Sequence, residues 1–197
     1  HTPDHRADYF ARYLSAPGFR ILALTRRRET DGISGNVSVE LPAVRFVTDI
    51  LNQRSLGFVR GINEKLGKGE VCIYALYAKR PKDITIEFPK RLYAGEKGAA
   101  RISLPSTSEN DMRVVRMEWI RPDGSKASHY TRVFRLTREQ PSRKIVLHPA
   151  VNDPTGEWQY RFTDVGTARS RVGVFTVKAF RNPTSLRSDP TCKPVSQ

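Results

Sequence analysis

The stretch Trp158-Gln159-Tyr160-Arg161-Phe162 alternates large aromatic residues with polar ones at every position. Successive side chains of a β-strand point to opposite faces, so this pattern predicts a strand with one buried and one exposed face. Val115, Met117 and Trp119 repeat the alternation in an earlier stretch. We therefore expect Trp119 to share one core with the three aromatic residues of the first stretch.

Turn signals separate this stretch from other short alternating segments. The clearest is Pro122-Asp123-Gly124, because proline presets φ and glycine tolerates a positive φ, as a tight turn needs. About seven short strands fit between Asp83 and Phe180, which is the pattern of an antiparallel β-sandwich. The sequence thus predicts a mainly β fold, with a sandwich over residues 82–180.

A resemblance supports this architecture. The segment Asp153-Pro154-Thr155-Gly156-Glu157-Trp158, followed by Phe175-Thr176-Val177, is similar to the closing hairpin of immunoglobulin-like modules, particularly macroglobulin-type and bacterial extracellular ones. It covers about half of the chain, from residue 83 to 180. The resemblance implies an immunoglobulin-like sandwich suited to binding, and it carries over no catalytic residue.

The preceding residues 1–81 are predicted to form a small α+β segment. Apolar residues of Asp4–Leu14 fall on one helical face, and a second helical stripe runs through residues 43–66, as two helices or as a helix and a strand. Residues 19–25 and 36–41 suggest a loose β-hairpin between them, and residues 70–78 a buried strand. The charged run Lys79-Arg80-Pro81-Lys82 marks the boundary, and residues 181–197 are expected to be an extended or disordered tail.

The chain of 197 residues carries a net charge of +14 and a pI of about 10.2. Such a charge draws a protein towards nucleic acid, acidic polysaccharide, anionic lipid or an acidic protein surface. The basic residues are spread along the whole chain, and no apolar run reaches the roughly 18 residues of a membrane helix. The chain begins His-Thr-Pro, which suggests a processed product.

The residues of catalysis and metal binding do not form recognisable patterns. The four histidines are His1, His5, His129 and His148, and the sequence has no Gly-x-Ser-x-Gly, His-Glu-x-x-His or Cys-x-x-Cys motif. We therefore expect no catalytic residue, no metal site and no cofactor.

The two cysteines, Cys72 and Cys192, offer two interpretations. Cys72 sits in the apolar run Val71–Tyr77 and could be a small buried hydrophobic residue. A Cys72–Cys192 disulfide would instead fasten the tail to the body. That bridge would imply an oxidising compartment, and hence a secreted or periplasmic protein.

The outward residues of the predicted sandwich are the best candidate binding surface. Arg116 and Arg161 would share a basic face if their strands are neighbours, together with Lys178. The leading hypothesis is a non-enzymatic binding or adaptor protein of the cell envelope or extracellular space, which engages an acidic protein or polysaccharide. Nucleic-acid binding is the alternative, as is an accessory domain attached to a fragment of a secreted enzyme.

Overall fold

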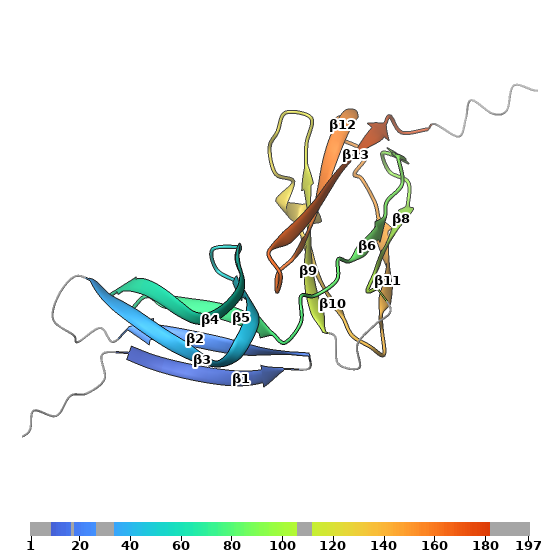
Figure 1. The fold of residues 1–197 in the computed structure, drawn as a ribbon. Coiled ribbons are helices and arrows are strands. Elements are labelled where there is room, and N and C mark those ends of the chain that lie inside the picture. The colour runs from blue at the N-terminus through green and yellow to red at the C-terminus, as the bar shows by residue number, and fades with distance from the viewer. Residues whose placement is uncertain (1–8, 17, 27–33, 106–111, 182–197) are drawn as a thin grey trace, which may run out of the picture.

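A computed structural model describes residues 9–16, 18–26, 34–105 and 112–181 of the chain (Figure 1). The fold is mainly β, and its sheets are largely antiparallel. The described residues form two groups of strands with separate hydrophobic cores. The N-terminal strands are β1 (Tyr9–Ala16), β2 (Phe19–Arg26), β3 (Ser34–Asp49), β4 (Arg54–Gly67) and β5 (Val71–Tyr77).

The N-terminal strands build one five-stranded sheet in the order β1-β2-β5-β3-β4. β3 and β4 form a long, curved hairpin, whose register shifts between Glu40 and Arg45 and again between Val47 and Thr48. Such irregularities bend a strand and increase its twist. The apolar residues of the hairpin share a core with β2 and β5, namely Leu22, Leu24, Val37, Leu41, Val47, Ile62, Leu66, Cys72, Tyr74 and Leu76.

The two helices predicted in this part of the chain are wrong. Residues 9–14 of the first lie in strand β1, whereas residues 4–8 lie outside the described residues. The second stretch is the β3–β4 hairpin, in which Gly57 has a φ of 75° that favours glycine. Neither stretch stands alone, because each is paired along its length with a neighbouring strand. The pairing with these neighbours stabilises the strand conformation more than the weak helical periodicity favours a helix.

The pairing of the early strands also differs from the prediction. β2 pairs with β1 and β5, whereas β3 pairs with β4 and β5. The loose hairpin expected between residues 19–25 and 36–41 is therefore wrong, because β5 separates the two strands. The buried strand predicted at residues 70–78 is confirmed as β5, in which Tyr74 and Ala75 are fully buried.

The C-terminal strands form two sheets that face each other (Figure 1). The five-stranded sheet has the order β10-β9-β12-β13-β7, and the three-stranded sheet has the order β11-β8-β6. In chain order the strands are β6 (Thr85–Glu87), β7 (Arg91–Tyr93), β8 (Gly98–Ser103), β9 (Arg113–Ile120), β10 (Arg132–Leu136), β11 (Ser142–Leu147), β12 (Gly156–Asp164) and β13 (Arg169–Lys178). A short 3₁₀ helix, Ser128–Tyr130, precedes β10.

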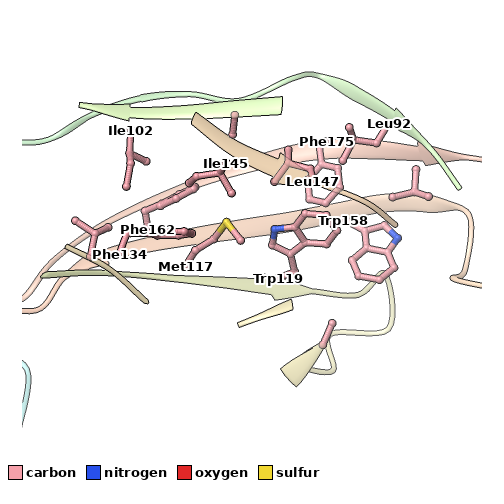
Figure 2. Close-up of a cluster of buried hydrophobic side chains, with 14 of the residues drawn as sticks. Leu92, Ile102, Met117, Trp119, Phe134, Ile145, Leu147, Trp158, Phe162 and Phe175 are labelled. Atoms are coloured by element: carbon pink, nitrogen blue, oxygen red, sulfur yellow. The ribbon is translucent and has the colours of Figure 1, made fainter. Parts of the chain in front are cut away.

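Both sheets contribute to a single core, which Figure 2 shows in close-up. Ile102 and Leu147 come from the smaller sheet and face Trp119, Trp158 and Phe162 from the larger one. The two tryptophan rings meet edge to face with centroids 6.0 Å apart, a favourable arrangement of aromatic quadrupoles. The predicted common core is confirmed, with Tyr160 half-buried against it.

A buried ion pair lies where the two groups of strands meet. Nη1 of Arg113, at the start of β9, lies 2.8 Å from Oδ2 of Asp164, at the end of β12, and both side chains are almost fully buried. The guanidinium carbon of Arg113 lies 5.7 Å from the ring centroid of Tyr77, the last residue of β5. The Tyr77 hydroxyl also approaches Gly166 so closely that a side chain there would clash. The end of the N-terminal sheet thus packs directly on the β12–β13 turn.

A second set of ion pairs ties the connecting segment to the same region. The carboxylate of Asp83 accepts hydrogen bonds from Arg169 and Arg171, at the start of β13. The hydrogen bond from Arg169, followed by the charges of the two arginines, holds the pKa of Asp83 below its usual range.

No helix in the described part of the chain is long and apolar enough to cross a membrane.

Candidate binding surface

The larger C-terminal sheet has one face on the core and an opposite face directed outward. Residues opposite one another on paired strands project to the same side, so the register of β10, β9, β12, β13 and β7 defines this outer face. We use the term outer face for Arg91, Tyr93, Val114, Arg116, Glu118, Ile120, Lys126, Val133, Arg135, Glu157, Gln159, Arg161, Thr163, Ser170, Val172, Val174, Thr176 and Lys178.

The structure brings two of the predicted residues together. Glu118 on β9 lies directly opposite Arg161 on β12, and Arg116 is two residues before Glu118 on the same strand. Nε of Arg116 lies 3.6 Å from Oε2 of Glu118, and Nζ of Lys126 lies 3.3 Å from Oε1. Glu118 is only 7% exposed, so two cations contact one largely buried carboxylate, and Arg161 stands opposite it on the neighbouring strand. Glu118 therefore neutralises part of the positive charge that an incoming anion would meet.

The third predicted residue, Lys178, lies apart from this pair. Arg161 pairs with Val172 on β13, and Lys178 is six residues further along that strand. At about 3.3 Å per residue, Lys178 lies roughly 20 Å from Arg161. Lys178 instead stands beside Tyr93 of β7, its partner in the parallel ladder.

Tyr93 is the centre of a second basic group, which sequence reasoning missed. The guanidinium carbon of Arg181 lies 3.5 Å from the centroid of the Tyr93 ring. Arg91 projects from the same side of β7. Hydrogen bonding with Arg181, followed by that with Arg91, lowers the pKa of the Tyr93 hydroxyl. We call Arg91, Tyr93, Lys178 and Arg181 the Tyr93 cluster. β7 has three residues, too few for alternation to reveal a strand.

Carboxylates are scarce around the Tyr93 cluster. Glu96 lies 4.0 Å from Nε of Arg181, and Glu157 is opposite Thr176 on the neighbouring strand. No carboxylate lies within 4 Å of Arg91 or Lys178 in the described part of the chain. Unlike Arg116, these two cations remain available to an external anion.

The outer face also carries exposed apolar side chains. Val133 is 63% exposed, and Val172 and Val174 are each 55% exposed. Single exposed apolar residues are ordinary. These three valines, however, lie in three adjacent rows of residues that run across the strands, beside the arginines. The face therefore combines apolar contact area with positive charge.

The two histidines that the structure describes each have their own neighbours. Nε2 of His148 lies 3.0 Å from the carbonyl oxygen of Gly95, and the ring of His129 packs on Tyr130 with centroids 4.0 Å apart. His1 and His5 lie outside the described residues. Among the residues that the structure describes, no group of three His, Cys, Asp or Glu side chains could hold a metal ion.

The predicted disulfide involves a residue that the structure does not describe. Cys72 is buried on β5 and has no disulfide partner among the residues that the structure describes, and burial raises the pKa of its thiol. Cys192 lies outside the described residues. The Cys72–Cys192 bridge stays a prediction.

Comparisons with known proteins add little. No protein family and no curated protein matches this sequence. Among solved structures, the chain is similar to the isomalto-dextranase of Arthrobacter globiformis T6 complexed with panose, with 14% identity and a TM-score of 0.29. The match covers 87% of this chain and 32% of the dextranase chain, so this chain spans about a third of that protein. A likeness this weak supports no conclusion about fold or function.

Proposed function

We propose that this chain is a non-enzymatic binding or adaptor protein whose outer face engages an acidic partner. The residues from β6 to β13 would be an immunoglobulin-like sandwich that presents this face, and the protein would act in the periplasm or outside the cell. This compartment follows from the predicted disulfide and from the resemblance to extracellular modules, and it is part of the proposal.

The observation that carries the proposal is the imbalance of charge on the outer face. Two carboxylates, Glu118 and Glu157, stand among the cations of this face, which are Arg91, Arg116, Lys126, Arg135, Arg161 and Lys178. A surface of one sign raises the local concentration of oppositely charged partners and speeds association. The excess positive charge therefore favours an acidic partner.

The exposed valines favour a protein over a polysaccharide as that partner. Val133, Val172 and Val174 would contribute apolar area near the centre of an interface, with the arginines around them. Arginine is enriched at protein interfaces because its planar group binds carboxylates in a bidentate manner. A sheet face that combines exposed valines with arginines fits an acidic protein surface.

Reversing the charge of Arg116 and Arg161 together tests this proposal. We expect the variant Arg116→Glu/Arg161→Glu to associate with poly-glutamate about tenfold more slowly, because steering of this kind acts mainly on the association rate. Kinetics at low and high salt would be followed on a biosensor surface. The control Arg138→Glu/Lys144→Glu carries the same change of charge at exposed positions outside the outer face.

The same assay separates the competing partners. Polygalacturonate and random duplex DNA would be compared with poly-glutamate at equal salt. Tighter binding of polygalacturonate would favour the polysaccharide, and tighter binding of DNA with a steep salt dependence would favour nucleic acid. Equal loss of binding in the control variant would show that only net charge matters, and the outer face would then not be the site.

A further inference from the structure

A hollow of about 310 Å³ opens at the end of the N-terminal sheet where β5 ends. Arg20 on β2 and Arg45 on β3 line it, with Leu76 of β5 between them. Leu76 is 4% exposed and forms an apolar floor, and Ala78 also lines the hollow. The side chain of Phe19 projects to the opposite face of the sheet, where its ring stacks on Tyr77. Ser15 adds a hydroxyl at the rim.

The register explains why the two arginines meet across this hollow. Leu76 pairs with Arg20 on one side and with Val47 on the other, and Arg45 is two residues before Val47 on the same side of β3. Two strand spacings of about 4.8 Å separate β2 from β3, so the two backbones lie roughly 10 Å apart. Arginine side chains are long enough for both guanidinium groups to reach one ligand from opposite sides.

Neither arginine has a carboxylate partner. No Asp or Glu oxygen lies within 4 Å of Arg20 or Arg45 in the described ranges. A second hollow, of about 210 Å³, differs in this respect, because its Arg169 and Arg171 both bind Asp83. The hollow at the sheet end therefore holds two cations whose charge the protein does not neutralise.

We propose that this hollow binds a small organic anion, whose oxyanion group bridges Arg20 and Arg45 and whose apolar part rests on Leu76 and Ala78. Guanidinium groups form strong, charge-assisted hydrogen bonds with carboxylate or phosphate oxygens. Concave sites with an apolar lining and a few convergent polar groups are the usual form of small-molecule sites. The site is independent of the outer face and of the proposed function.

Phenyl phosphate, benzoate and inorganic phosphate serve as the probes. The expected order is that the two aromatic anions bind more tightly than inorganic phosphate, with the backbone amide signals of Ser15, Arg20 and Leu76 shifting in NMR titrations. Each of Arg20→Gln and Arg45→Gln should weaken phenyl phosphate about tenfold, since each removes charge-assisted hydrogen bonds. Arg45→Lys keeps the charge without the bidentate geometry and should lose less.

Arg12→Gln is the matched control, because Arg12 is an exposed arginine that projects from the opposite face of the same sheet. The amide spectrum of each variant checks that the sheet is intact. Equal affinity for inorganic phosphate and phenyl phosphate would overturn the proposal, because the apolar floor would then contribute nothing. A loss in Arg12→Gln as large as that in Arg20→Gln would overturn it too, since the binding would then reflect net charge alone.

Discussion

Replacing Arg113 by leucine should destabilise the C-terminal strands by about 3–5 kcal/mol at neutral pH, because the change leaves a buried carboxylate without its cation. The side chain of Asp164 is only 3% exposed and lies 2.8 Å from Arg113. Its carboxylate also accepts a hydrogen bond from the backbone N–H of Gly166, at 3.1 Å, and interacts with the side chain of Thr167. Leucine fills part of the vacated volume, so the uncompensated charge dominates the loss rather than a cavity.

The loss should depend on pH with a defined sign. Burial raises the pKa of Asp164, while the charge of Arg113 opposes that rise. Without Arg113 the folded-state pKa rises further above the unfolded value of about 3.9. A carboxyl group with a raised folded-state pKa destabilises the protein as pH increases, because the unfolded chain then ionises more readily. The variant should therefore lie closest to the parent protein near pH 4 and furthest from it near pH 7.

Urea denaturation followed by tryptophan fluorescence measures this effect. The chain has two tryptophans, Trp119 and Trp158, and both lie in the C-terminal core, so the signal reports on that part of the molecule. The denaturation midpoint should fall while the slope of the transition stays constant. Arg135→Leu, at an exposed position of the outer face, is the control. A loss below about 1 kcal/mol at neutral pH, or one independent of pH, would refute the reasoning.

Three further predictions follow from other contacts. Trp158→Ala should cost about 3–5 kcal/mol in the same assay, because the fully buried ring would leave a cavity; a cost near that of an exposed substitution would contradict its place in the core. Asp83→Asn should lessen the protein's sensitivity to acid: the pKa of Asp83 is lowered by Arg169, so its stabilisation is present at neutral pH and is lost as pH falls below about 4. A parent and variant that lose stability in parallel below that pH would contradict this. For Cys72–Cys192, mass spectrometry after denaturation and alkylation without reductant should find no modified cysteine; two alkylated thiols would show that the bridge is absent.

The C-terminal strands could be predicted because their pattern is local. Trp158 and Phe162 alternate with polar residues, and the tight turn after β9 carries Gly124 with a φ of 82°. Alternation with turn residues is a signal within a few neighbouring positions. The N-terminal strands lack it, since β1 is exposed on both faces and β3 is bent by register shifts. Their strand state depends on partners that the sequence does not identify.

The candidate sites were harder to predict than the strands, because their residues are far apart in the sequence. Arg113 reads as the first residue of a strand, yet its carboxylate partner Asp164 is 51 positions away. Alternation placed Arg116 and Arg161 on the side opposite the core, but it could not show that Glu118 stands between them. The Tyr93 cluster required knowing that β7 pairs in parallel with β13. Registers of this kind are set by packing across the whole sheet.

The position of β13 has a consequence for synthesis of the protein. This strand is the last of those that the structure describes, yet it lies between β12 and β7 and supplies the buried Phe175 and Val177 to the core. All five N-terminal strands are complete once Tyr77 has left the ribosome, so that sheet can form on the nascent chain. The C-terminal sheets cannot be completed until about a hundred further residues have been synthesised. Until then, β7 has no partner and the aromatic core stays open, which makes this interval the one in which the chain is most exposed to aggregation.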